Sequence, residues 1–299
     1  MRITMLGLVF LLISSMALGQ QTVMIDDMTG TEVMEAIAHG KTTVIIYVGG
    51  LHENTYQAEN TVYVGPHVDA LAINKHNLVA LYQARRIAEE LGNALAYNPM
   101  PYTPAGSHLK PSTAGGTVAL SNSTFAAVLR EMAGSAIVSG FTHVILIGED
   151  GGGQSVLKDV AEELDRKWSS KGTRVFFFPV YSDANKVTAA YLEKIEDFPR
   201  DCLTNGIGGC ISATTDASEI LFLQKENVRM DKVSPAIAKF VSPGLGKVLN
   251  EQKVKIAVDY INSVEDEFSF KARIALLTHE GYNADLAELN EWDKAQVRP

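Results

Sequence analysis

Short apolar runs alternate along this chain with longer segments of helical periodicity. The runs TTVIIYVGG (42–50) and THVILIG (142–148) are rich in β-branched residues and end at glycine, which is typical of buried strands. The segments 74–92, 123–140 and 154–172 repeat apolar residues with a helical period, and each stops at glycine. Strands that alternate with helices at this spacing predict an α/β fold, in which helices cover both faces of a parallel sheet.

Further elements extend this pattern toward the C-terminus. The run TRVFFFPVYS (173–182) predicts another strand, and the chain from 93 to 106 predicts a short strand that leads into a proline-rich loop. Additional helices are expected over 187–198, 218–224 and 251–268.

The strand ends are where a fold of this kind binds ligands. The strand at 142–148 is followed by two carboxylates, Glu149 and Asp150, and then by three glycines. Acids at the carboxyl end of a strand face the cleft, and glycines there allow a ligand or a neighbouring backbone to approach closely. The stretch GGLHEN after the first strand is expected to lie at the same edge.

Size and charge restrict the functions that this chain can have. Its 299 residues, 46% of them hydrophobic, can bury one large core or two small ones. A net charge of -9 argues against binding to nucleic acid, which requires a basic face, and is compatible with metal cations.

The N-terminus has the features of a secretory signal peptide. Arg2 precedes an apolar stretch that is too short for an ordinary membrane span, and small residues at Ala17 and Gly19 match the preference of signal peptidase. We expect cleavage after Gly19, which leaves 20–299 as a single domain, located in the periplasm or outside the cell and not bound to a membrane. The alternative is an uncleaved N-terminal anchor.

The two cysteines, Cys202 and Cys210, enclose a short glycine-containing loop. In an exported protein such a pair most often forms a structural disulfide. The alternative is a reactive or metal-binding thiol.

Imidazoles and carboxylates gather in the segment between the first strand and the first long helix. His52, His67 and His76 share this segment with acids that include Glu53. A polar loop of this length in a compact domain favours a functional role, and imidazole with carboxylate is a ligand set for zinc, manganese or iron. The alternative is that each is an exposed loop residue.

Several motifs, in order, resemble those of the creatininase (creatinine amidohydrolase) family. The match runs over about residues 42–231: GPH (65–67), AGGT (114–117), GFTHVILIGEDGGG (140–153), DASE (216–219) and NVRMD (227–231). The resemblance implies a three-layer α/β/α sandwich with a mostly parallel sheet, a pair of divalent metals, hydrolysis of a cyclic or linear amide, and a homo-oligomer.

The resemblance also assigns residues, with departures from the family pattern. The first acid ligand aligns with His52, or with Glu53 if the register shifts by one. The bridging aspartate aligns with His76, which cannot bridge two metals as a carboxylate does, and a motif histidine aligns with Asp150. The last motif places Cys210 at a histidine position and Asp216 at its acid partner.

These alignments predict a single-metal site, with zinc expected and manganese or iron as alternatives. Its candidate ligands are His52 or Glu53, His76, Asp150 and Asp216. Three further residues are candidates for catalysis: Glu149 as general base or as hydrogen-bond partner of a ligand imidazole, His67 in substrate binding or as a loop cap, and Cys210 as a thiol if it is not in a disulfide.

The predicted function is that of an exported, metal-dependent amidohydrolase of the creatininase type, acting on a small amide. The alternative is a catalytically degenerate protein of the same fold that binds a small ligand or a partner. A third possibility is a structural subunit whose segment 55–64 forms an oligomer interface.

Overall fold

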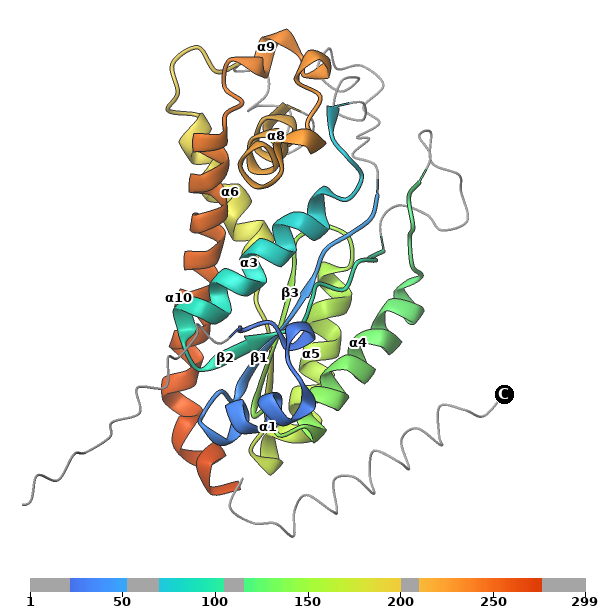
Figure 1. Ribbon diagram of the computed structural model, residues 1–299, viewed down its shortest axis with the longest axis vertical. Coiled ribbons are helices and arrows are strands. Elements are labelled where there is room, and N and C mark those ends of the chain that lie inside the picture. Colours follow the sequence, from blue (N-terminus) through green and yellow to red (C-terminus); the bar gives the residue numbers. More distant parts are fainter. Residues whose placement is uncertain (1–21, 53–69, 105–115, 200–209, 276–299) are drawn as a thin grey trace, which may run out of the picture.

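The computed structural model describes residues 22–52, 70–104, 116–199 and 210–275. Its centre is a four-stranded sheet in the order β2-β1-β3-β4, with every pair parallel. The strands are β1 (Thr43–Val48), β2 (Ala94–Ala96), β3 (His143–Gly148) and β4 (Arg174–Phe177). Thr43 lies beside His143 and Val48 beside Gly148, so β1 and β3 end at the same level. Figure 1 shows the sheet between two sets of helices.

Helices connect and flank these strands. The α-helices are α1 (Gly30–Ala38), α3 (Lys75–Leu91), α4 (Asn122–Val138), α5 (Gln154–Trp168), α6 (Val180–Leu192), α8 (Cys210–Leu223), α9 (Pro235–Ala238) and α10 (Pro243–Ala275). Short 3-10 turns lie at Ile25–Asp27, Ser169–Lys171, Lys225–Asn227 and Met230–Lys232.

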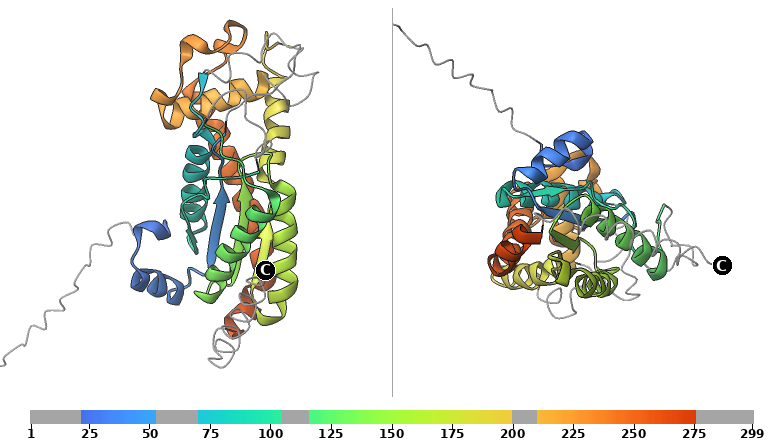
Figure 2. Two further views of the ribbon diagram at one scale, coloured as in Figure 1. Left: turned by 90° about the vertical axis from the view of Figure 1, so that its right-hand side faces the viewer. Right: turned by 90° about the horizontal axis from the view of Figure 1, so that it is seen from below.

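Alternate residues of the central strands point to opposite faces of the sheet, as the pleat requires. Val44 and Leu146 pack with residues of α4 and α5 on one face. Ile45 and Ile147 pack with residues of α3 and α10 on the other. The two views of Figure 2 show these helix layers on either side of the strands. The chain therefore has the α/β fold with helices on both faces that its sequence predicts.

A third apolar cluster lies beyond the carboxyl ends of the strands. It is built mainly from α8, α9 and the neighbouring turns, with Ile220, Ile237 and Phe198 among its fully buried members. In Figure 1 α8 and α9 form the upper part of the molecule, above the point where β1 and β3 end. The rim of the sheet, where the acids and imidazoles were expected, is thus covered by these helices.

Four predicted elements have wrong boundaries. The predicted helix at 187–198 overlaps only the last part of α6, which runs from Val180 to Leu192. The predicted strand at 173–182 ends as β4 at Phe177, and α6 begins at Val180, directly after Pro179. The predicted helix at 218–224 is the last part of α8, which starts at Cys210. The helix expected over 251–268 is the middle of α10, which runs for 33 residues.

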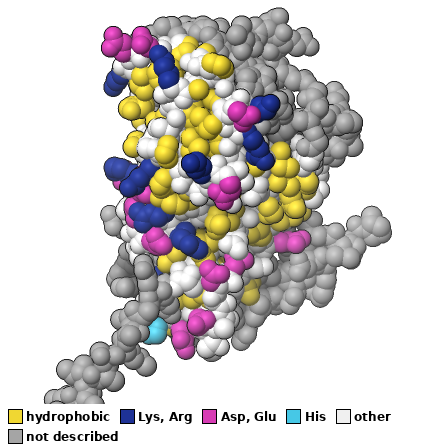
Figure 3. All heavy atoms as spheres, turned by 45° about the horizontal axis from the view of Figure 1, so that its top comes forward, with side chains coloured by type: hydrophobic (Ala, Val, Ile, Leu, Met, Phe, Trp, Pro, Cys, Tyr) yellow, Lys and Arg dark blue, Asp and Glu magenta, His cyan; other side chains and the backbone are white. Residues whose placement is uncertain are grey.

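Two further observations concern membrane-spanning helices and the distribution of charge on one face of the molecule. No helix within these ranges has both the length and the apolar character needed to cross a membrane. On the face shown in Figure 3, lysine and arginine side chains alternate with acidic ones, with hydrophobic side chains between them.

Candidate metal centre

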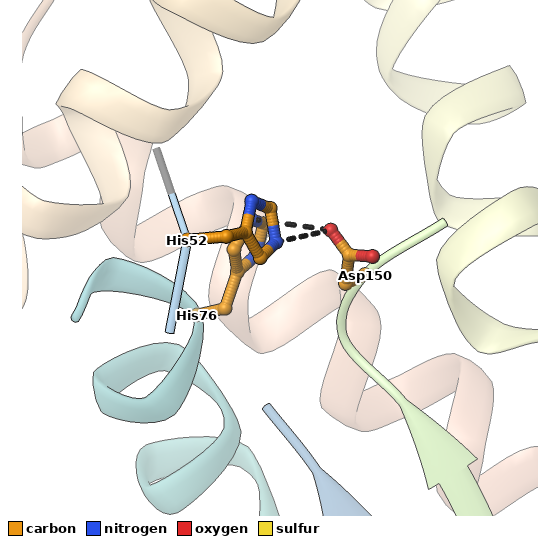
Figure 4. A group of neighbouring side chains, drawn as sticks. All are labelled: His52, His76 and Asp150. Atoms are coloured by element: carbon orange, nitrogen blue, oxygen red, sulfur yellow. Dashed lines mark hydrogen bonds and ion pairs between the residues drawn. The ribbon is translucent and has the colours of Figure 1, made fainter. Parts of the chain in front are cut away.

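Three of the predicted ligands converge at the carboxyl ends of β1 and β3. His52 lies shortly after β1, His76 in the first turn of α3, and Asp150 two residues beyond β3. The Oδ2 atom of Asp150 lies 2.8 Å from Nε2 of His52 and 3.4 Å from Nε2 of His76. Figure 4 shows both imidazoles directed at this carboxylate. Residues 98 positions apart in the sequence therefore meet at one point.

The two imidazoles are held in a common orientation. Their rings stack with centroids 4.6 Å apart and an angle of 27° between the planes. One ligand atom from each of His52, His76 and Asp150 lies within 4.8 Å of the other two. The second carboxylate oxygen of Asp150, Oδ1, accepts a hydrogen bond from the backbone N–H of Gly152. This bond fixes the carboxylate so that Oδ2 faces the imidazoles.

The glycines after β3 are explained by close backbone packing. A Cβ atom at Gly152 would lie 2.2 Å from the carbonyl oxygen of Pro104. The carbonyl oxygen of Gly152 accepts a hydrogen bond of 2.9 Å from the hydroxyl of Thr103. Gly153 has a positive φ of 79° and precedes the first residue of α5, a conformation that glycine adopts at little cost. The turn that carries Asp150 therefore rests against the segment after β2.

The loop after β1 is held against α3 by a hydrogen bond and by close packing at a glycine. The side-chain oxygen Oδ1 of Asn77 accepts a hydrogen bond of 2.9 Å from the backbone N–H of Gly50. A Cβ atom at Gly49 would lie 2.1 Å from the same oxygen. This contact links the backbone just before His52 to the residue just after His76, so the two imidazoles are positioned together.

The protonation states of two of these groups suit a cation. Burial lowers the pKa of His76 well below its ordinary value, and the neighbouring charge of Lys75 lowers it further. At Asp150 burial acts to raise the pKa, but the hydrogen bond from His52 and the proximity of His76 outweigh it and lower the pKa to about 2. At neutral pH the site therefore presents a neutral imidazole at His76 and an ionised carboxylate at Asp150, which are the forms that bind metals.

The donor set fits a divalent metal. Two imidazole nitrogens and one carboxylate oxygen, all within 4.8 Å of one another, form a three-residue group among the described residues. Three protein ligands with a remaining open position are typical of catalytic zinc sites, and the same donors suit manganese and iron.

Glu149, adjacent to Asp150 in sequence, faces a different partner. Its Oε1 accepts a hydrogen bond of 2.7 Å from Nζ of Lys253 in α10, and the same ammonium lies 2.8 Å from Oε1 of Glu219 in α8. All three residues are buried. Burial raises the pKa of Glu149 to about 7, against the opposing effect of Lys253. The structure thus places Glu149, which was expected to act as general base or to bond a ligand imidazole, in an ion pair with Lys253.

Asp216 lies next to the centre but is not a member of the group of three. Its Oδ2 forms an ion pair with Nζ of Lys75, which is buried at the start of α3. The carboxylate is near enough to act on the pKa of His76. The structure therefore places this predicted ligand against a lysine.

Tyr181, at the start of α6, also faces the centre. Burial raises its pKa to about 12, and the charges of Asp216 and Asp150 act in the same direction. Its ring lies close to the turn after Asp150, because a Cβ atom at Gly151 would be 3.6 Å from it. The phenol consequently keeps its proton at neutral pH beside two carboxylates.

Several predicted site residues fall outside the described parts of the chain. Glu53, His67 and Cys202 lie there, and Cys210 is described only as the first residue of α8. Four residues that the sequence analysis did not select lie at or near the site: Lys75, Tyr181, Glu219 and Lys253. Only Lys75, next to His76, and Glu219, at the end of DASE, carried a signal in the sequence.

Comparisons with known proteins identify one family that matches this sequence and one fold that matches this structure. The sequence model of the creatininase family, described as creatinine amidohydrolase, matches residues 61–281. No curated protein matches the chain.

Solved structures described as creatininases share the fold at low sequence identity. A mutant creatininase of Zn–Zn type is 17% identical with a TM-score of 0.61, and a creatininase with Mn is 17% identical with a TM-score of 0.60. A mutant creatininase complexed with creatine is 16% identical with a TM-score of 0.59. Each alignment covers 83% of this chain and 99% of the other.

Proposed function

Because the chain belongs to the creatininase family, we propose that it is a metal-dependent amidohydrolase that hydrolyses a small cyclic or linear amide. The observation that carries this proposal is the convergence of His52 and His76 on one oxygen of Asp150. One solved relative is described as bound to creatine, which supports a small substrate.

The residues that would hold the ion are His52, His76 and Asp150. Zinc is the proposed metal, with manganese as the alternative, since solved relatives are described with both. When bound, a divalent cation supplies Lewis acidity toward an amide carbonyl and toward water.

Other groups of the chain would bind and orient the amide. Because the pKa of Tyr181 is raised to about 12, its phenol is protonated at neutral pH and would donate a hydrogen bond from Oη to a substrate oxygen or to the leaving nitrogen. The ion pair of Lys75 and Asp216 offers both a donor and acceptors at the same edge. The side chains of His52, His76 and Asp150 are 12%, 8% and 12% exposed, which limits the access of water to them.

The proposal is tested by assaying the purified chain, loaded with Zn²⁺ or Mn²⁺, against a panel of small cyclic and linear amides that includes creatinine. We expect hydrolysis of at least one member, and its loss in His76→Ala. The exposed variant Glu162→Ala on α5 is the control and should retain activity. Metal binding without turnover of any amide would favour the degenerate ligand-binding protein instead.

The predicted signal peptide leads to a proposal about location, and the family resemblance leads to one about assembly. We propose that the chain is exported, cleaved after Gly19, and assembled as a homo-oligomer. N-terminal sequencing of the protein from the periplasmic or extracellular fraction tests the first part, because a sequence that begins at Gln20 is expected. Light scattering of the purified protein tests the second, and a monomeric mass would contradict it.

A further inference from the structure

A second group of charged side chains is buried beside the metal centre. We call it the carboxylate–lysine triad: Glu149, Lys253 and Glu219. The ammonium of Lys253 lies 2.7 Å from Oε1 of Glu149 and 2.8 Å from Oε1 of Glu219. The exposed fractions of the three side chains are 4%, 8% and 3%. Such deep burial of two carboxylates is costly unless a cation compensates them.

The triad adjoins the metal centre through the backbone. Glu149 and Asp150 are consecutive residues at the end of β3, and their carboxylates diverge. Asp150 faces the imidazoles of His52 and His76, whereas Glu149 faces Lys253. The strand end therefore carries two carboxylate sites side by side, and one of them already contains a positive charge.

Neutral polar groups complete the surroundings of the triad. Tyr47 donates a hydrogen bond of 2.5 Å to Oε1 of Gln83, and the amide of Gln83 donates one of 3.2 Å to Asn250. Burial raises the pKa of the Tyr47 phenol, and Glu149 lies close enough for its carboxylate to raise that pKa further. The two glutamates therefore place carboxylate oxygens around one ammonium, and oxygens of this kind are also ligands of divalent cations.

We infer that Lys253 is a built-in cation of this chain: its ammonium fills a two-carboxylate cation site beside the metal centre, so that one divalent ion binds per chain instead of two. The inference rests on the proposed function in that it takes His52, His76 and Asp150 as the site of that one ion. The lysine is attached to α10, which packs against both α8 and α3, so its ammonium cannot diffuse away and is not displaced as a free ion would be.

Removal of the ammonium should convert the triad into a metal site. In Lys253→Met the two carboxyl groups lose the ammonium that lowers their pKa. A divalent ion binds them by displacing any proton they carry, and it then balances the two negative charges of Glu149 and Glu219. Oxygen ligands of zinc lie at about 2.0–2.2 Å, which requires a movement of each glutamate side chain of less than about 1 Å from its present distance to Nζ. Methionine keeps the unbranched apolar stem of the lysine as far as Cε and lacks only the ammonium.

The experiment counts metal ions per chain in the full-length protein. The protein is saturated with Zn²⁺ or Mn²⁺, excess ion is removed by gel filtration, and bound metal is measured by mass spectrometry. We expect one ion in the wild type and two in Lys253→Met. Lys255→Met is the matched control, because Lys255 lies on the same helix, is exposed and pairs with Asp259 at 2.7 Å; it should bind one.

A second substitution identifies the new site. Glu219→Gln added to Lys253→Met removes one of the two carboxylates, and the count should return to one. A wild type that binds two ions, or a folded Lys253→Met that gains none, would overturn the inference.

Folding is followed in the same variants by circular dichroism with and without Mn²⁺. A Lys253→Met protein that folds only with the ion supports the inference, because the ion then replaces the ammonium. Failure to fold even with the ion overturns it. A wild type that binds no ion contradicts the proposed function alone, since the gain of one ion in Lys253→Met is still measured separately.

Discussion

At the scale of single residues, His76 is a buried imidazole that links the stability of the fold to pH. Burial depresses its pKa well below the ordinary value, so below about pH 6.5 the unfolded chain binds a proton that the folded chain does not. Stability from His76 is therefore fully present above that pH and is lost as the pH falls. The contribution of Glu149 to stability changes with pH in the opposite direction. Its pKa is raised to about 7, so below this value the folded chain binds a proton that the unfolded chain does not.

A comparison of variants separates these two effects. We expect the metal-free wild type to lose stability relative to His76→Gln as the pH falls below about 6.5, by at most about 1.4 kcal/mol per pH unit. The measurement is urea unfolding at a series of pH values between 5 and 8 in the presence of a chelator. Parallel curves for the two proteins would show that the charge of His76 is not suppressed in the folded state.

The turn after β3 provides a second residue-scale prediction. Gly152→Ala places a methyl group 2.2 Å from the carbonyl oxygen of Pro104, so the backbone that orients Asp150 must move. We expect a loss of about 1–3 kcal/mol in stability together with weaker metal binding, measured by urea unfolding and by titration with Zn²⁺.

Gly151→Ala is the matched control for this turn. The Cβ atom there would lie 3.6 Å from the ring of Tyr181, which is an ordinary contact. Equal effects of the two substitutions would mean that crowding against Pro104 does not determine the shape of the turn.

The residue types at the centre were predictable from the sequence, but their partners were not. Imidazoles and acids at two strand ends indicated the group of His52, His76 and Asp150, which the structure brings together. Asp216 was assigned by alignment and Glu149 by its place at the end of a strand, and both pair with buried lysines. A lysine in an amphipathic helix, such as Lys253, has no local signal of burial, because its partners lie on β3 and α8.

At the scale of elements, the contact of α10 with α8 determines where Lys253 lies. Gly246, in the first turns of α10, approaches the backbone of α8 so closely that a Cβ atom would lie 1.9 Å from the carbonyl oxygen of Ser218. Asn250, one turn further, donates a hydrogen bond of 2.9 Å to the carbonyl oxygen of Gly246. The position of α10 over the triad therefore depends on a glycine at this position.

Gly246→Ala should separate the two helices and destabilise the fold. We expect a loss of about 1–3 kcal/mol, and a fall in Tm of several degrees, measured by thermal unfolding. Gly244→Ala is the control, because among the described residues its Cβ would approach only the Ser242 hydroxyl, at 3.9 Å. If Gly244→Ala lowers Tm as much as Gly246→Ala, the close approach to α8 is not the cause.

The accuracy of the element predictions follows the strength of their local signals. The helix at 74–92 was well defined, because apolar periodicity ends at Gly92, which adopts the left-handed conformation at the end of α3. Residues 175–180 are all apolar, so periodicity could not show that β4 stops at Phe177 and that α6 begins after Pro179. The first turns of α8 contain serine and threonine, which are weak helix formers, and tertiary packing decides their conformation.

At the scale of the whole molecule, the sheet and its helices bring residues that are distant in sequence to one edge of the sheet. Parallel strands β1 and β3 end at the same level, α3 returns His76 to that edge, and α8 and α10 supply the buried partners of Glu149 (Figures 1 and 4). The family, the fold and the three converging side chains all favour the proposed metal hydrolase. The fold class followed from the alternation of strands and helices, whereas the covering of the strand ends by α8 and α9 depends on long-range packing.

The central claim is that His52, His76 and Asp150 together bind a divalent metal, and the most direct test is the metal content of Asp150→Asn. This substitution keeps the shape of the side chain but removes the charge toward which both imidazoles point. The account predicts that zinc affinity, measured by competition with a chelating dye, falls about 100-fold or more, while Asp159→Asn on the exposed side of α5 keeps wild-type affinity. Unchanged zinc affinity in Asp150→Asn would contradict the claim.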